Sequence, residues 1–153
     1  MIYIDRNKVK IPEILSDPKK KGQKETAKAI KYYSGKKPES LAAFNYTSYR
    51  DQEVKETLTL LFKEKCAYCE SKFSHVYSGD VEHFRPKGEI EEASPNKKPG
   101  YYWLASDWHN LLLSCRNCNQ KLSHLLHGAS KKVVLGKMNQ FPLSDNTKYV
   151  RKH

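Results

Sequence analysis

Hydrophobic residues recur at helical spacing in the first half of the chain, over about residues 48–63. Val54, Leu58, Leu61 and Phe62 fall on one face when residues are placed at about 3.6 per turn. This stretch is therefore predicted to be an amphipathic helix whose apolar face packs on another part of the protein.

A second, lysine-rich helix is predicted before it, ending at about Tyr33. Asp17 and Pro18 are typical of a helix start, because aspartate is favoured at the N-cap and proline at the first helical position. A turn with glycine and proline over residues 34–38 then ends the helix. Residues 1–62 are therefore predicted to form a helical segment, which packs on the rest of the chain or docks on a partner.

The pattern changes after residue 63, where short apolar runs alternate with turn residues. These runs predict, in chain order, a hairpin or irregular strand pair over 73–84 with a turn at 78–80, a loop over 87–100, a buried strand at 111–113, and a helix over 119–127 with Leu122, Leu125 and Leu126 inward and Gly128 as its cap. Two strands and a helix around one metal is the architecture that this order implies. The predicted fold class is α+β, with residues 63–153 as one domain.

The bulk composition limits the size of the core and favours a polyanionic partner. The chain has 153 residues, of which 38% are hydrophobic, so its core is modest and a structural metal would help to stabilise it. Its net charge is +11 and its isoelectric point is about 9.4. Such an excess of positive charge suits nucleic acid, although a soluble lysine-rich protein would show it as well.

No part of the sequence predicts a membrane segment or an exported protein. The apolar runs are far shorter than the roughly 18 residues that a membrane-spanning helix needs. Charged residues interrupt the start of the chain too early for the apolar stretch of a signal peptide. A cytoplasmic protein is therefore expected, and in that compartment thiols stay reduced.

Four cysteines lie in two Cys-x-x-Cys pairs, Cys66 with Cys69 and Cys115 with Cys118. Reduced cysteines in this spacing are typical of a tetrahedral structural zinc site. In a simple zinc ribbon the second pair follows after about 15–20 residues, whereas here 45 residues intervene. The intervening segment is therefore expected to have a function besides holding the metal.

That segment contains Glu82 and His83, and Asn119 directly follows the last cysteine. Hydrolysis of a phosphodiester needs an activated water and a cation on the scissile phosphate. A neutral imidazole is a suitable base at cellular pH, and carboxylate and amide oxygens are suitable ligands of a hard divalent ion. His83 is therefore a candidate for such a base, and Glu82 and Asn119 could supply oxygen ligands for the ion, leaving positions open for water and phosphate.

These residues, in this order, resemble the motif of HNH endonucleases, which fold as a ββα-metal finger. The resemblance implies that His83 is the general base and that Glu82 and Asn119 bind the catalytic ion. Asn110 would hold the loop by hydrogen bonds, and the four cysteines would bind a separate, structural zinc. The position one turn after Asn119 in the predicted helix is Ser123 rather than a histidine, so Mg²⁺ or Mn²⁺ is expected as the catalytic ion.

Four flanking segments are similar to the nuclease subunit, PtuB, of Septu-type anti-phage systems, a family also found with some retrons. These segments are 81–87, 101–105, 110–115 and 141–143. The resemblance covers about residues 66–143 and implies a DNA substrate and an ABC-type ATPase partner, PtuA. Arg85, Lys87, Arg116 and Lys121 lie near the motif and are expected to contact nucleic-acid phosphates.

Three functions fit the sequence. The first is an endonuclease that cuts DNA through His83 and one metal ion; one such site nicks one strand, so a homodimer within a larger complex would be needed to cut both. The second is a non-catalytic zinc-containing module that binds nucleic acid. The third is an adaptor whose N-terminal part docks on a larger partner. The Glu82-His83 pair and Asn119 favour the first, because a zinc ribbon has no need of them.

Overall fold

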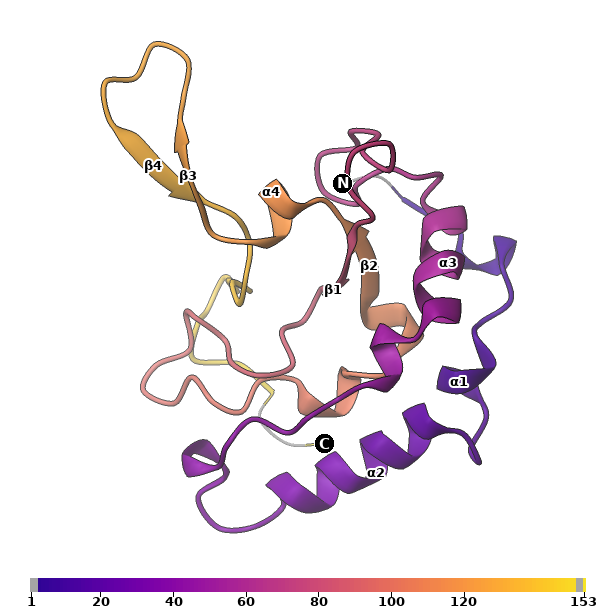
Figure 1. Cartoon of the computed structure of the whole chain (residues 1–153). Helices are drawn as coiled ribbons and strands as arrows, with labels where there is room; N and C mark the ends of the chain where they lie inside the picture. Colours follow the sequence, from indigo (N-terminus) through magenta and orange to yellow (C-terminus); the bar gives the residue numbers. More distant parts are fainter. Residues whose placement is uncertain (1–2, 151–152) are drawn as a thin grey trace.

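The computed structural model describes residues 3–150 and 153 (Figure 1). Residues 1–2 and 151–152, at the ends of the two predicted segments, lie outside the described residues. The helices and strands are α1 (Glu13–Ser16), α2 (Lys21–Tyr33), α3 (Gln52–Leu61), β1 (Asp80–His83), β2 (Leu111–Ser114), α4 (Arg116–Asn119), β3 (Leu122–Leu125) and β4 (Lys132–Leu135). Short 3₁₀ helices are η1 (Arg6–Lys8), η2 (Pro38–Ser40), η3 (Ser48–Arg50), η4 (Tyr102–Leu104) and η5 (Trp108–Asn110). No helix in this described part of the chain has the length and apolar character needed to cross a membrane.

The amphipathic helix predicted over 48–63 is confirmed as α3, which is shorter than predicted. The Asp51 carboxylate accepts a hydrogen bond from the backbone N–H of Glu53 at 3.0 Å, so Asp51 is the N-cap and the helix begins after it. The residues before it form η3. The four apolar residues of the predicted face are buried, namely Val54, Leu58, Leu61 and Phe62.

The lysine-rich helix is confirmed as α2, but its predicted start is wrong. The carboxylate of Asp17 accepts a hydrogen bond from the backbone N–H of Lys19 at 2.7 Å, which closes a turn, and the helix begins at Lys21 instead. Gly22 lets α2 approach α1 closely, because a Cβ at this position would lie 2.7 Å from the carbonyl oxygen of Ile14. The two helices therefore pack directly on each other.

The strand predicted at 111–113 is confirmed as β2, but the hairpin predicted over 73–84 is wrong. β1 pairs antiparallel with β2, with Glu82 opposite Leu112 and His83 opposite Leu111. Phe73 instead accepts turn hydrogen bonds at its backbone carbonyl, and its ring is buried. The physical reason is the burial of β2. A strand with three consecutive leucines has apolar side chains on both faces, so it lies in the interior, and there it pairs with β1.

The helix predicted over 119–127 is also wrong. α4 ends at Asn119, and the following residues form β3, which pairs antiparallel with β4 in a sheet of its own. Leu125 and Leu126, predicted to point inward, are exposed. Gly128 lies in the turn between the two strands with a φ of +77° and caps no helix. The pair projects away from the rest of the molecule, at the upper left of Figure 1.

The N-terminal helices and the β1–β2 sheet share one hydrophobic core. Its buried residues include Leu15 and Ala29 from the first two helices, Leu58 from α3, and Leu111 and Leu113 from β2. The predicted segment 1–62 therefore packs on the rest of the chain, and the observed fold is α+β as predicted. This packing places α3 against β2, and it places Tyr49 of η3 against the His83 ring at the end of β1.

Candidate active site and metal centre

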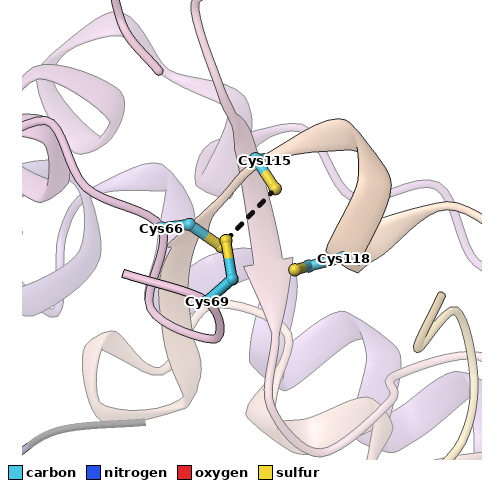
Figure 2. Close-up of side chains that lie close together, drawn as sticks. All are labelled: Cys66, Cys69, Cys115 and Cys118. Carbon is cyan, nitrogen blue, oxygen red and sulfur yellow. Dashed lines mark hydrogen bonds between the residues drawn. The ribbon is translucent and has the colours of Figure 1, made fainter. Parts of the chain in front are cut away.

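The four cysteines come together as a compact cluster between the start of α4 and the loop before β1 (Figure 2). Their sulfur atoms all lie within 4.8 Å of one another. The Sγ atoms of Cys69 and Cys115 are 3.9 Å apart. A tetrahedral zinc with Zn–S bonds of about 2.3 Å requires sulfurs about 3.8 Å apart. The cluster therefore has the ligand type, number and spacing to hold a zinc ion.

The electrostatics of the cluster also suit a cation. Burial raises the pKa of the Cys66 thiol, but backbone N–H groups, including those of Cys115 and Tyr68, outweigh burial and lower it to about 6. Burial and the neighbouring sulfurs raise the pKa of Cys118. One thiolate thus forms readily, and further ionisation is opposed by repulsion between like charges. A bound divalent cation would remove that repulsion.

His83 ends β1 and is buried, with 5% of its surface exposed. Its Nε2 lies 2.9 Å from the carbonyl oxygen of Ala105. Because a carbonyl only accepts, Nε2 carries the hydrogen, and the lone pair of the neutral ring is on Nδ1. Tyr49 packs edge-on against the ring, with centroids 4.6 Å apart. The side chain is therefore fixed in orientation and in tautomer.

The surroundings of His83 keep its ring uncharged. Burial is the main cause, and the nearby cations of Lys87, Lys137 and Arg50 add to it, lowering the pKa of His83 to about 3. The Lys87 Nζ lies 3.4 Å from Nδ1 and 4.6 Å from the centroid of the Tyr49 ring. At neutral pH the ring is thus uncharged, and its Nδ1 lone pair faces the Lys87 ammonium.

Glu82 is buried and paired with Lys137. The Lys137 Nζ donates to Glu82 Oε1 at 2.8 Å and to the backbone oxygen of His83 at 3.0 Å. Burial raises the pKa of Glu82, and the Lys137 charge opposes that rise. The carboxylate that was predicted to bind a metal ion therefore already has a cation against one of its oxygens.

Asn110 makes the loop-holding hydrogen bonds that the resemblance implies. Its Oδ1 accepts from the backbone N–H of Arg85 at 2.8 Å, and its Nδ2 donates to the backbone oxygens of Arg85 at 3.0 Å and Leu104 at 3.1 Å. Its own carbonyl accepts from the N–H of Phe84 at 2.9 Å. The residues that follow His83 are therefore tied to the end of η5 through Asn110. Its part in the function stays a prediction.

Asn119 lies beside Asp80, a residue that was not predicted for the site. Its Nδ2 donates to Asp80 Oδ2 at 2.8 Å, which turns Oδ1 away from that carboxylate. Asp80 and Glu82 are two residues apart on β1, so their side chains point to the same side of the strand. Such carboxylate and amide oxygens fit Mg²⁺ or Mn²⁺. Among the described residues, the four cysteines are the only group of three or more His, Cys, Asp or Glu side chains that lie close enough together to share an ion. Asp80 and Glu82 do not form such a group.

The four residues predicted to contact nucleic acid lie in different surroundings. The Arg85 guanidinium lies about 6 Å from the ring centroids of Tyr101 and Phe141. Arg116 is exposed and donates to Gln120 at 3.3 Å. Lys121 instead forms an ion pair with Glu91. Lys87, described above, lies closest to the predicted base, and the phosphate contacts of all four remain a prediction.

Lys137 is a second site residue, after Asp80, that the sequence interpretation missed. Its backbone N–H donates to the carbonyl of Cys118 at 2.8 Å, and that of Met138 donates to the carbonyl of Asn119 at 2.7 Å. The β3–β4 pair therefore leaves the site after α4 and returns the chain to the same place. The sequence did contain a sign of this: β-branched Val133 and Val134, with Gly136 two residues later, indicate a strand and a turn.

A small cavity opens over the pair Glu82 and His83. Its volume is about 240 Å³. The other residues that line it come from the end of α2, the loop after η2, and the segments that follow β1 and β4: Tyr33, Ala43, Phe44, Tyr46, Pro86, Lys87, Gly88, Met138 and Asn139. The predicted base and the predicted metal ligand therefore share one cavity, and Lys87 is among the residues that line it.

Comparison with known proteins identifies two relatives. Septu protein PtuB of Bacillus mycoides (strain KBAB4) is 40% identical over 106 residues, which are 68% of this chain and 31% of that protein. Septu protein PtuB of Bacillus thuringiensis is 32% identical over 83 residues, 54% of this chain and 27% of that protein. The chain thus spans about a third of the length of these relatives. No family model and no solved structure matches it. Over the 106 aligned residues, the chain is a homologue of Septu protein PtuB.

Proposed function

We propose that this protein is a metal-dependent HNH endonuclease that cuts DNA as part of an anti-phage defence system. The observation that carries the proposal is the buried, neutral His83, whose tautomer is fixed by Ala105 and whose Nδ1 lone pair adjoins Lys87. A carboxylate, Glu82, lies next to it in the sequence and lines the same cavity. The homology to PtuB supports a defence function and a partner related to the ATPase subunit PtuA.

In this proposal, His83 accepts a proton at Nδ1 from the water that attacks the scissile phosphate. Lys87 lies next to that atom and would bind a phosphate oxygen, so the attacking water and the phosphate would meet at the mouth of the cavity. The negative phosphate would also raise the pKa of His83 from its low value in the free protein, which makes it a stronger base when substrate is bound. Asn110 keeps the following loop in position.

The proposal includes two metal ions with different functions. A zinc ion at Cys66, Cys69, Cys115 and Cys118 would be structural. A Mg²⁺ or Mn²⁺ ion at Glu82 and Asn119, with Asp80 next to them, would supply a positive charge on the scissile phosphate. Arg85, Arg116 and Lys87 would contact the DNA backbone around it.

The test is DNA cleavage by the purified chain, alone and with its ATPase partner, with added Mg²⁺ or Mn²⁺. The His83→Ala variant is expected to lose cleavage by at least a hundredfold while it keeps its zinc content, because the ring lies outside the cysteine cluster. Its thermal stability should fall, since the ring is buried and hydrogen-bonded to Ala105, so cleavage is compared at a temperature at which circular dichroism shows the variant to be folded. His109→Ala is a matched control, since His109 is exposed and lies away from the cavity. Undiminished cleavage by His83→Ala would remove this residue from the mechanism.

One observation favours a non-catalytic, zinc-containing nucleic-acid-binding module or adaptor. The ammonium of Lys137 lies against Glu82, where a catalytic ion would bind in the first proposal. Glu82→Gln separates the two functions. In a nuclease this variant should need more Mg²⁺ for half-maximal cleavage, because it lacks the charge that attracts the ion. A binding module would bind DNA without added Mg²⁺ and would not cut it. Its DNA affinity would not depend on Mg²⁺ in the wild type or in Glu82→Gln.

A further inference from the structure

The β3–β4 hairpin has two exposed faces and no strand partner beyond itself. In the described chain its two strands form a separate sheet, and apolar side chains point to both sides. Leu125 on one strand is 62% exposed, and Val134 on the other is 64% exposed. An isolated two-stranded hairpin is marginally stable in water, and contiguous exposed apolar surface marks an interaction site. The exposed apolar side chains of the hairpin therefore indicate a surface that contacts another molecule.

The charge of the hairpin identifies the kind of partner. Residues 120–144 contain four lysines and two histidines but no aspartate or glutamate. Lys121 and Lys137, at the base, pair with Glu91 and Glu82. Lys131 and Lys132, at the far end, are exposed and have no acidic partner among the described residues. A cationic end of this kind is complementary to a polyanion.

We infer that the β3–β4 hairpin is an arm that binds double-stranded DNA and directs it to the cavity at His83. The major groove of DNA admits a two-stranded β-ribbon, where lysines can meet phosphates and aliphatic side chains can contact thymine methyl groups. The base of the arm joins the site directly, because Lys137 is hydrogen-bonded both to Cys118 and to Glu82. This inference rests on the proposed function, since it names how the DNA substrate would be held.

The experiment measures the affinity of the full chain for a fluorescent duplex by anisotropy, without added Mg²⁺, at several salt concentrations. The double variant Lys131→Glu/Lys132→Glu is expected to bind roughly tenfold more weakly, and the slope of log affinity against log salt should fall by about 2, one for each lost phosphate contact. A variant in which two glycines replace residues 121–135 should lose affinity further. Both should keep zinc and thermal stability.

The matched control is Lys24→Glu/Lys28→Glu, which makes the same charge change on the exposed face of α2. It should leave the affinity within about twofold, because α2 lies away from the arm. An equal loss in the control would show that binding depends on net charge alone and would overturn the arm. Duplex RNA has a deep, narrow major groove that a β-ribbon cannot enter. If Lys131→Glu/Lys132→Glu lowers the affinity for duplex RNA as much as that for duplex DNA, binding of the hairpin in the major groove is refuted.

Two further outcomes separate this inference from the nuclease proposal. If the hairpin variants lose DNA affinity but the wild-type chain never cuts DNA, the arm stands and the nuclease proposal fails. If the wild type cuts DNA and the hairpin variants bind and cut it as well as the wild type, the arm fails and the nuclease stands. Unchanged DNA binding with lost association to the ATPase subunit would make the hairpin a protein-docking surface and would also overturn the inference.

Discussion

Replacing Lys137 by methionine should destabilise the protein by about 3 kcal/mol at pH 7 and leave it folded. Methionine keeps much of the length of the side chain but removes the ammonium that donates to Glu82 and to the backbone oxygens of His83 and Met138. The pair is well shielded, since 14% of the Lys137 side chain and 9% of the Glu82 side chain are exposed. Breaking a buried pair in this way typically costs about 3–5 kcal/mol, because one charge is left without a partner.

Protonation of Glu82 limits the part of that loss that comes from its unpaired charge. A carboxylate without its cation can take up a proton, and at pH 7 this costs about 1.4 kcal/mol for each pH unit above its ordinary pKa of 4.5. The limit is therefore about 3.4 kcal/mol at pH 7 and below about 1 kcal/mol at pH 5. Burial already raises the pKa of Glu82 in the wild type, and loss of the Lys137 charge raises it further in the variant. The stability of the variant relative to the wild type should therefore recover as the pH falls through this window.

The assay is urea unfolding of the zinc-loaded chain, followed by tryptophan fluorescence at pH 7 and pH 5. In a thermal scan of the same protein, a loss of about 3 kcal/mol should lower the melting temperature by roughly 6–12 °C at this chain length. Adding Mg²⁺ should restore part of the loss if Glu82 binds that ion, because binding to the folded state alone is stabilising. The double variant Lys137→Met/Glu82→Gln should be more stable than Lys137→Met, since it leaves no unpaired charge.

Lys148→Met is the matched control for this experiment. Lys148 pairs with Asp145 at 3.3 Å, but 78% of its side chain is exposed. Its loss should cost less than about 1 kcal/mol at either pH. A Lys137→Met variant that is as stable as this control, or whose destabilisation is the same at pH 5 and pH 7, would refute the buried pair as the source of the stability.

Two further predictions concern the metal centre and the predicted base. Cys115→Ser should lose zinc and unfold, because ligation supplies folding energy; circular dichroism and elemental analysis measure this, and a well-folded variant would count against a structural zinc. The pKa of His83 is about 3 in the folded chain against 6.5 ordinarily, so the unfolded chain takes up its proton first and stability falls as the pH drops below about 6.5. Between pH 7.5 and 5.5 the His83 contribution should fall by about 1.4 kcal/mol. His83→Asn should remove that part of the pH dependence in urea unfolding, and an unchanged slope would contradict the burial argument.

Features that depend on local rules could be predicted from the sequence. The spacing of Cys66 and Cys69 and of Cys115 and Cys118 is enough to indicate a four-sulfur cluster, which the structure contains. The apolar period of α3 and the three consecutive leucines of β2 likewise identify a helix and a buried strand. Each of these patterns spans only a few neighbouring residues, so the local structure could be predicted without knowing which distant residues it contacts.

The errors occurred where a distant partner decides the structure. Leu122, Leu125 and Leu126 are spaced three and four apart, which fits a helix, yet they belong to the hairpin because β4 supplies a strand for β3 to pair with. In the same way, β1 was assigned a partner in its own neighbourhood, whereas the partner it takes is β2, across the loop over 87–100. Pairing over such distances leaves no local trace, so short apolar runs stay ambiguous.

The position of Lys137 follows from the hairpin and could not be read without it. From the sequence, the lysine nearest the last motif residue is Lys121, but that side chain pairs with Glu91. The hairpin closes on itself, since the N–H groups of Lys137 and Met138 donate to Cys118 and Asn119. A hairpin whose two ends meet does not change the arrangement of the residues at its base. Lys137, far along the chain from Asn119, can therefore occupy the place next to the motif that the sequence suggested for Lys121. The cation beside Glu82 is therefore determined by a contact in space, and the length of the hairpin between the two residues is free to vary.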